Sequence, residues 1–326
     1  MTCVGYGKII LLGEHAVVYG YPALAAALDR GVTIAPVATP AGGPLRLELR
    51  VWNVAVAAGD DHPVARSLAA IADELGAGRP PLSLIGDAQI PPGAGLGSSA
   101  ALAVAVARAV LTHLQRPIDP TGGAAPRPAG GAVRVPTPRL AALDDPALLI
   151  RAAGASEALV HGRPSGVDVA LAVAGGVGVF RRTTGLLPLT RVPPLRVLVG
   201  PSGVPRSTAA MIDRVAQATG GQADDARLRE LGALTDTATA ALLAGDRTGL
   251  GAAMDRAHGL LADLGVSTPA LDALCEAARA AGAEGAKLTG AGGGGAVIAV
   301  APAGREPAIL AAWKQAGVDG FVATVR

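Results

Sequence analysis

The chain has 326 residues, half of them apolar, and a formal net charge of +2. This length allows one or two domains, and the apolar content is sufficient for a sizeable core. A nearly neutral charge and 2% aromatic residues argue against a surface that binds nucleic acid. The apolar runs are interrupted by arginine or by glycine pairs before the roughly 18 residues that a membrane helix needs, so we expect no membrane span.

The N-terminus and the cysteines indicate a cellular compartment. The first 15 residues, MTCVGYGKIILLGEH, lack a basic leader and carry Glu14 where a signal peptide would still be apolar. Cys3 and Cys275 are distant in the sequence and suggest neither a disulfide framework nor a metal motif. We therefore expect a cytoplasmic protein whose two thiols are reduced and inert.

The first third of the chain has mostly strand patterns. Apolar or alternating runs bounded by glycine and proline predict strands within 7–15, 45–57 and 82–90. Residues 63–76 begin with proline, end with glycine and have a 3.6-residue apolar period, which predicts a helix. A glycine-rich stretch then leads into a second predicted helix, largely buried, from Ser98 to His113.

The middle of the chain is less regular. Residues 116–138 are rich in proline and glycine without any period, which predicts a surface loop. We expect a helix over 146–160. An irregular polar stretch, HGRPSGVD, follows, and then a glycine-broken strand region over 169–180.

From about residue 187 the chain becomes rich in helix patterns. The expected order is a strand at 195–202, helices at 206–219, 225–244, 247–264 and 268–281, strands at 286–290 and 296–302, a helix at 305–317 and a strand at 321–326. Strands first, helices next and a sheet again at the end indicate an α+β fold. We expect two lobes, over residues 1–185 and 186–326.

The stretch PPGAGLGSS at 91–99 carries the first candidate chemistry. Gly93, Gly95 and Gly97 stand at alternate positions, so successive backbone N–H groups can converge on one point. At a helix N-terminus such donors form an anion site. Ser98 and Ser99 can cap the helix or offer hydroxyls to a phosphate or to Mg²⁺. The alternative is a glycine-rich turn with a serine cap on a core helix.

Neither common nucleotide-binding motif fits. The P-loop pattern requires a lysine that this stretch lacks, and residues 93–97 have the spacing G-x-G-x-G rather than G-x-G-x-x-G. The latter spacing does occur at Gly290, Gly292 and Gly295, but a strand pattern follows it where a dinucleotide fold needs a helix. Four consecutive glycines before a core strand usually allow a ligand or another backbone to approach closely.

Charged and polar residues near these stretches are further candidates. Only three of the 28 basic residues are lysines, and two of them, Lys8 and Lys287, lie beside glycine-containing segments. Glu157 and Asp168 flank a Pro-Ser-Gly turn, a pattern that suits a Mg²⁺ ligand plus a carboxylate near a reacting hydroxyl. The alternative roles are an edge-strand lysine for Lys8, a helix-surface glutamate for Glu157 and a turn aspartate for Asp168. Arg206, Ser207 and Thr208 stand at a predicted helix start, as caps or as anion-facing groups.

Together, four segments resemble one family. GKIILLGEH, PPGAGLGSSAA, the Glu157–Asp168 pair with HGRPSGVD, and KLTGAGGGG follow each other in the order seen in the GHMP small-molecule kinases. GEHAVVYG and HGRPSGVD resemble the branch of that family that phosphorylates mevalonate. The resemblance spans nearly the whole chain. It implies a ribosomal-protein S5-like N-terminal lobe and a ferredoxin-like C-terminal lobe, with ATP and Mg²⁺ as cofactors.

The resemblance also implies a role for each matching residue. Asp168 corresponds to the carboxylate that acts as base or orients the attacking hydroxyl, and Lys8 to the lysine that stabilises its charge. Ser99 and Glu157 correspond to the Mg²⁺ ligands. The expected ATP-binding residues are Pro92, Gly93, Ala94, Gly95, Leu96, Gly97, Ser98, Ser99, Gly290, Gly292 and Gly293. The expected substrate-binding residues are Glu14, His15, Ser165 and Thr208.

Three positions depart from the family pattern without removing a catalytic group. Tyr6 precedes Gly7 where proline is usual, Val169 follows Asp168 where asparagine is common, and Ala296 stands where cysteine is frequent. Val169 adjoins the expected base, so other acceptors, such as phosphomevalonate or a sugar, stay open. A catalytically silent ligand-binding relative is a further alternative. The expected partners are a small-molecule substrate and, as one option, a second copy of the chain.

Overall fold

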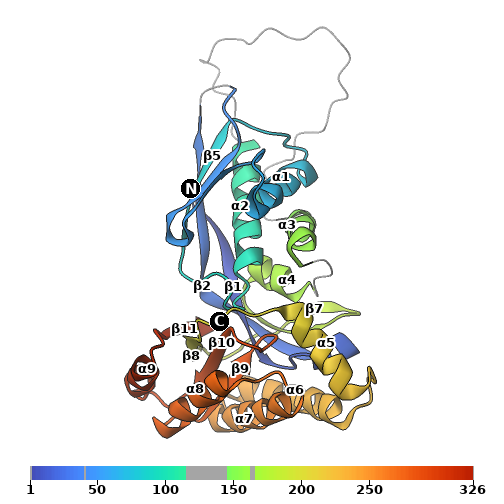
Figure 1. Cartoon of the computed structure of the whole chain (residues 1–326), viewed down its shortest axis with the longest axis vertical. Helices are drawn as coiled ribbons and strands as arrows, with labels where there is room; N and C mark the ends of the chain where they lie inside the picture. The colour runs from blue at the N-terminus through green and yellow to red at the C-terminus, as the bar shows by residue number, and fades with distance from the viewer. Residues whose placement is uncertain (1, 40–41, 115–144, 162–165, 326) are drawn as a thin grey trace. The chain divides into compact units, whose positions relative to one another are not determined.

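A computed structural model describes residues 2–39, 42–114, 145–161 and 166–325. The strands are β1 (Cys3–Leu12), β2 (Ala23–Ala38), β3 (Arg46–Leu49), β4 (Val54–Ala57), β5 (Leu82–Ala88), β6 (Val177–Arg181), β7 (Gly185–Pro188), β8 (Leu195–Pro201), β9 (Gly285–Thr289), β10 (Ala296–Val300) and β11 (Phe321–Val325). The helices are α1 (Pro63–Glu74), α2 (Ser98–Leu114), α3 (Pro146–His161), α4 (Val167–Ala174), α5 (Thr208–Thr219), α6 (Ala226–Ala244), α7 (Arg247–Asp263), α8 (Pro269–Ala280) and α9 (Glu306–Gln315), with short 3₁₀ turns at Ala16–Tyr19 and Arg50–Trp52 (Figure 1). The loop predicted at 116–138 lies outside the described residues.

Contacts divide the chain into two compact units that interleave along the sequence. Unit 1 comprises Met1–Gly5, Thr33–Ala88 and Leu102–Pro164, and unit 2 comprises Tyr6–Val32, Gln89–Ala101 and Ser165–Arg326. The elements β1, β2 and α2 contribute residues to both units. The predicted lobes at 1–185 and 186–326 are continuous segments, and this boundary stays a prediction.

Unit 1 places helices beside a small mixed sheet. Strand β3 runs antiparallel to β4 and parallel to β5, and β5 is the neighbour of β2. Helix α1 begins as its sequence predicts: Pro63 is its first residue, and the His62 side chain accepts a hydrogen bond from the Val64 N–H. Its apolar face is buried, and α1 packs against α3. From Leu102 to Leu111, α2 is nearly all buried, as its apolar sequence predicts.

Unit 2 contains a four-stranded antiparallel sheet with the order β11-β8-β10-β9. Helices α7 and α8 pack on β9, α9 packs on β8, and α6 packs on α7 (Figure 1). The edge strand β9 directs outward N–H groups toward α7. Asp255 Oδ1 accepts from Ala286 N at 2.8 Å, and His258 Nδ1 accepts from Leu288 N at 3.3 Å. These side chains satisfy donors that an open sheet edge would leave unpaired.

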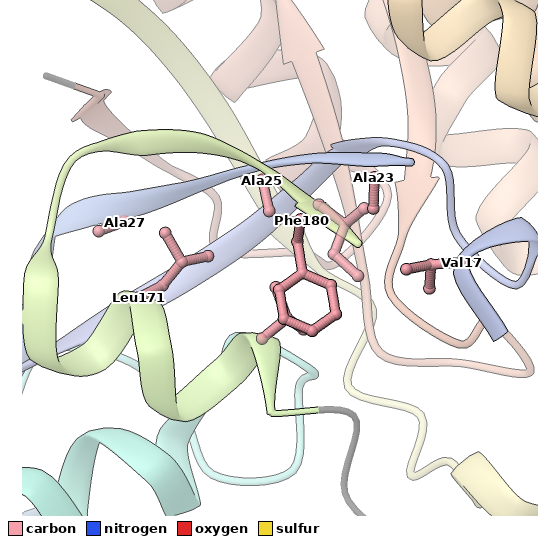
Figure 2. Packing of buried hydrophobic residues seen from close by; sticks show 8 residues of the cluster. Val17, Ala23, Ala25, Ala27, Leu171 and Phe180 are labelled. Carbon is pink, nitrogen blue, oxygen red and sulfur yellow. The ribbon is translucent and has the colours of Figure 1, made fainter. Parts of the chain in front are cut away.

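Further strands of unit 2 pack against α4. Strand β1 pairs with β2, the first half of β2 pairs with β6, and β6 pairs with β7. A buried apolar cluster joins these strands to α4. Figure 2 shows Leu171 of α4 directed toward β2 and the Phe180 ring of β6 between these elements. The cluster consists of Ile10, Val17, Ala23, Ala25, Ala27, Val167, Leu171 and Phe180.

The predicted secondary structure is wrong in two respects: it contains no strand where the structure has the 16-residue β2 and the short β7, and it places a strand where α4 lies. We expected a glycine-broken strand region at 169–180, but residues 167–174 form a helix and only 177–181 a strand. The helix starts after Gly166 at φ 88° and ends at Gly175 at φ 66°. The apolar run between these glycines is short, and periodicity alone does not distinguish a buried helix from a buried strand.

The other predicted elements agree with the structure to within a few residues, and the α+β fold class is confirmed. Among the described residues, no helix is both long enough and apolar enough to cross a membrane. Cys3 and Cys275 are buried free thiols. Burial raises the pKa of Cys275 to about 12, as expected for an inert thiol.

Candidate active site

The first glycine run adopts the backbone that its sequence predicts. Gly93, Gly95 and Gly97 have φ values of 72°, 79° and 72°, a region that residues with a side chain rarely adopt. Helix α2 begins directly after the run, at Ser98. Ser98 and Ser99 therefore lie in its first turn, half-buried, where the positive end of the helix dipole favours an anion.

Lys8 and Asp168 form an ion pair beside this run. The Lys8 Nζ lies 3.2 Å from Asp168 Oδ1, and the side chains are 3% and 30% exposed. The Lys8 N–H donates to the Leu96 carbonyl at 2.8 Å, which fixes β1 to the glycine run. A Cβ on Gly97 would lie 2.8 Å from Lys8 Cγ, so this position leaves room for the lysine stem. The pair combines a buried cation with a partly accessible carboxylate.

A second cation, Arg206, reaches both glycine runs. A Cβ on Gly95 would lie 2.6 Å from its Cζ, and a Cβ on Gly290 would lie 2.7 Å from its Nη1. That Nη1 is buried and has no hydrogen-bond partner among the described residues. Burial lowers the pKa of Arg206, while the Asp168 charge opposes the shift. An arginine keeps its charge despite such a shift, so a guanidinium with an unused donor lies beside the predicted phosphate loop.

The second glycine run, Gly290–Gly295, joins two strands rather than a strand and a helix. Five of its residues have positive φ. The Gly293 N–H donates to the Val266 carbonyl at 2.8 Å, and the Gly295 N–H donates to the Val204 carbonyl at 3.0 Å. A Cβ on Gly295 would lie 3.1 Å from the Ala94 carbonyl oxygen. The two glycine runs therefore lie in contact within unit 2, although almost 200 residues separate them.

The Gly13–His15 segment contacts the strand before the second run. Lys287 Nζ donates to Glu14 Oε1, and His15 Nε2 lies 2.8 Å from the Ala291 carbonyl oxygen. Glu14, His15 and Lys287 are all buried. Burial lowers the pKa of His15; the hydrogen bond to the Ala291 carbonyl opposes this shift, and the charges of Arg206 and Lys287 add to it, so the imidazole is neutral near pH 7.

The remaining predicted residues lie in three places. Thr208 is the exposed first residue of α5, directly after the cap Ser207, whose side chain accepts from the Ala210 N–H. Ser165 lies outside the described residues. Glu157, a predicted metal ligand, is a buried carboxylate on α3 in unit 1, whereas Ser99 belongs to unit 2. A hydroxyl and a carboxylate are oxygen ligands of the kind that Mg²⁺ prefers.

Two residues of the site have no specific role predicted from the sequence. The sequence predicts Arg206 as either a helix cap or an anion-facing group, and its guanidinium contacts both glycine runs. Lys287 was noted only as a neighbour of the second run, yet it is fully buried and paired with Glu14. The rarity of lysine in this arginine-rich chain was the signal that could have identified Lys287.

The arrangement suits the transfer of an anionic group to an oxygen nucleophile. Glycine N–H groups, a helix N-terminus, Lys8 and Arg206 supply positive potential, and Asp168 supplies an accessible base. Phosphoryl transfer needs this combination of positioning and charge neutralisation more than it needs covalent chemistry.

Comparison with known proteins supports the same chemistry. Two family models match the chain, GHMP kinases N terminal domain over residues 62–124 and GHMP kinases C terminal over residues 238–319. The chain is 33% identical to the mevalonate kinase of Aeropyrum pernix, over 98% of this chain and 94% of that protein. It is 31% identical to the mevalonate kinase of Mus musculus, over 95% of this chain and 88% of that protein.

A solved structure agrees with these relatives. The mevalonate kinase of L. major, determined in complex with R-mevalonate, superposes with a TM-score of 0.79 at 25% identity, covering 100% of this chain and 96% of that chain. The predicted family and fold are thus confirmed. At this identity over nearly its full length, the chain belongs to the GHMP kinase family and, within it, to the mevalonate kinases.

Proposed function

We propose that this protein transfers the γ-phosphoryl group of ATP to the 5-hydroxyl of mevalonate and forms 5-phosphomevalonate, a step in isoprenoid biosynthesis. The observation that carries the proposal is the Lys8–Asp168 pair beside the glycine run that precedes α2. The family membership supports the reaction class, and the mevalonate bound to the L. major relative supports the choice of acceptor.

In the proposed reaction, Asp168 accepts the hydrogen bond of the acceptor hydroxyl and serves as base for its proton. Lys8 Nζ, 3.2 Å from that carboxylate, stabilises the negative charge that develops on the hydroxyl oxygen. The N–H groups of Gly93, Gly95 and Gly97 and the start of α2 hold the ATP phosphates. Arg206 adds a cation at the same loop. Glu14, His15, Ser165 and Thr208 are the proposed contacts to mevalonate.

Mg²⁺ is the proposed metal, with Ser99 and Glu157 as its protein ligands. Within the described ranges, no three His, Cys, Asp or Glu side chains gather as a metal site. An ion held by one hydroxyl, one carboxylate and the nucleotide phosphates needs no such cluster. When bound, Mg²⁺ neutralises the phosphate charge and orients the β- and γ-phosphoryl groups. We also propose a cytoplasmic location, with a homodimer as the oligomeric state to test.

Purified protein assayed for ADP release over a panel of acceptors tests the reaction. Mevalonate should support turnover, and phosphomevalonate and galactose should not. Turnover on one of the latter without turnover on mevalonate would sink the assignment, and binding without turnover on any acceptor would favour the silent alternative.

The variant Asp168→Ala tests the proposed base. It should lose at least ~10²-fold in kcat, the low end for removal of a general base, while nucleotide binding is retained. Asp213→Ala, which removes an exposed carboxylate from α5 in the same unit, is the matched control. Unimpaired turnover of Asp168→Ala would refute the role given to this carboxylate.

A further inference from the structure

Lys287 is a buried cation without a part in the proposed reaction. It lies in the middle of β9, has no exposed surface, and is among the largest fully buried side chains of the described chain. Its Nζ donates to Glu14 Oε1 and, at 2.6 Å, to the Leu288 carbonyl. Burial lowers the pKa of Lys287, and the Glu14 charge opposes that shift. An ammonium ion in such a site is tolerated only when it is paired.

The partner of Lys287 uses only half of its acceptor capacity. Glu14 is 1% exposed, and its Oε2 is buried without a hydrogen-bond partner among the described residues. A buried carboxylate oxygen in this state is costly, and a ligand that donates a hydrogen bond to it would remove the cost. Lys287 thus occupies one oxygen of Glu14 and leaves the other oxygen available.

Three alternate residues of the 287–291 segment contact the stretch from Ile10 to His15. Lys287 contacts Glu14. Thr289 Oγ1 accepts from Ile10 N at 3.0 Å and donates to the Ile10 carbonyl at 2.9 Å, and the Ala291 carbonyl meets His15. Ile10 lies two residues beyond Lys8 on β1, so the same contacts fix the position of the strand that carries the proposed catalytic lysine.

The backbone that these contacts hold has an unusual conformation, which is strained at His15. Gly13 has φ 94°, and a Cβ there would overlap the Pro22 carbonyl oxygen. His15, which has a side chain, adopts φ 60° and ψ −47°. Such conformations persist only where surrounding contacts over-determine them, and they concentrate at ligand sites. The pair between Lys287 and Glu14 is one of the contacts that fix this segment.

We propose that Lys287 is a positioning residue that sets the affinity for the acceptor substrate through Glu14. It touches neither substrate. It fixes one carboxylate oxygen of Glu14 so that the other accepts a hydrogen bond from a hydroxyl of the acceptor. This inference rests on the proposed function, in which Glu14 contacts mevalonate.

A double-mutant cycle tests the proposal. The variants Lys287→Met, Glu14→Gln and the double variant are compared with the wild type for kcat, for the KM of each substrate and for thermal stability. Each single variant should raise the KM for mevalonate by roughly 10-fold or more, as expected from losing a hydrogen bond to a charged group. The KM for ATP should change by less than roughly 3-fold, the effect expected of a site that is not in contact with the nucleotide.

The double variant is the decisive arm. Its KM for mevalonate should equal that of Glu14→Gln alone, because Lys287 has no further route to the substrate. Its Tm should exceed that of Lys287→Met, since no buried charge is left unpaired. The proposal would be overturned if the increases in the KM for mevalonate of the two single variants multiplied in the double variant. It would also be overturned if the KM for ATP rose as much as the KM for mevalonate.

Two controls keep the test clear. Lys314→Met removes an exposed lysine from α9 and should leave both KM values unchanged. Where Lys287→Met fails to fold, comparing the double variant with Glu14→Gln still decides: equal KM values support the proposal, and a further increase overturns it. If the wild type used another acceptor, the proposed function would fail, and the same cycle with that acceptor would still test Lys287.

Discussion

The two glycine runs of unit 2 have similar sequences but different surroundings. At Gly93 an added Cβ would meet nothing within 4 Å, and at Gly95 and Gly97 it would meet the cationic side chains of Arg206 and Lys8. In the second run, an added Cβ would meet the backbone of Val266 at Gly292 and the backbone of Val204 at Gly294. In the first run, glycine at Gly95 and Gly97 leaves room for cationic side chains, whereas at Gly292 and Gly294 of the second run the protein's own backbone fills the space.

This difference separates function from folding at positions that look alike in the sequence. Positive φ is common to both runs, so conformational strain is a shared cost of any substitution. The neighbours differ, and therefore the consequences should differ. Substitutions in the first run should change kinetics, and substitutions at Gly292 and Gly294 should change stability.

The largest effect is expected at Gly292. In Gly292→Ala the new Cβ would overlap the Val266 carbonyl oxygen, which also accepts from the Gly293 N–H. The free energy of unfolding should fall by about 3 kcal/mol or more, measured by urea denaturation. Gly304→Ala is the control, since Gly304 has φ 86° but no neighbour within 4 Å, and it should lose only about 1 kcal/mol. Equal losses in the two variants would show that packing is not the reason for glycine here.

Gly97→Ala should affect the chemistry more than the fold. Its Cβ would lie 2.8 Å from Lys8 Cγ and would displace the ammonium from Asp168. A displacement of about 1 Å costs roughly 10²-fold in rate, so kcat should fall on that order while stability falls by about 1 kcal/mol. Steady-state kinetics and urea denaturation of the same sample measure both. An unchanged kcat would mean that Lys8 is not held by this contact.

Gly93→Ala should give a smaller and more selective effect. The position is open, so the stability loss should be only the strain of φ 72°, about 1 kcal/mol. If the Gly93 N–H faces a phosphate, the KM for ATP should rise by roughly 2- to 10-fold, the value of one neutral hydrogen bond. The KM for mevalonate should stay unchanged. A rise in that KM alone would place the acceptor rather than the nucleotide at this end of the run.

The smallest effect concerns pH and the strand before the second run. His258, which accepts from the Leu288 N–H, has a pKa lowered mainly by burial. Lys287 and Arg279 act in the same direction, and Asp272 opposes them. Because the unfolded chain binds a proton below about pH 6.5 and the folded His258 does not, stability should fall as the pH decreases below that value.

A variant isolates the contribution of His258 to this pH dependence. The loss should stay below about 1.4 kcal/mol per pH unit for this one group, and it should shrink in His258→Asn. Urea denaturation of both proteins at pH 7.5 and pH 5.5 measures the difference. A wild type and a variant with the same pH dependence would contradict the assignment.

Local features of the sequence were enough to predict most of the elements. The proline before α1, the glycines that end helices and the apolar period of α8 act within a few residues, so the chain itself carries these signals. Helix α4 and strands β2 and β7 were exceptions. For α4, a short apolar run between glycines is compatible with both the helix and the strand period. The positive φ of the glycine runs was likewise a local property.

The sequence by itself therefore determined the fold class and the family, and it supplied most of the residues proposed for the chemistry. Only the tertiary structure decided which of them meet: Lys8 with Asp168, Arg206 with both glycine runs, and Lys287 with Glu14 across 273 positions. Nothing near Lys287 in the sequence indicates whether its ammonium faces solvent or a carboxylate. Burial supplies that information, because an ion removed from water must find its counter-ion wherever the folded chain places one.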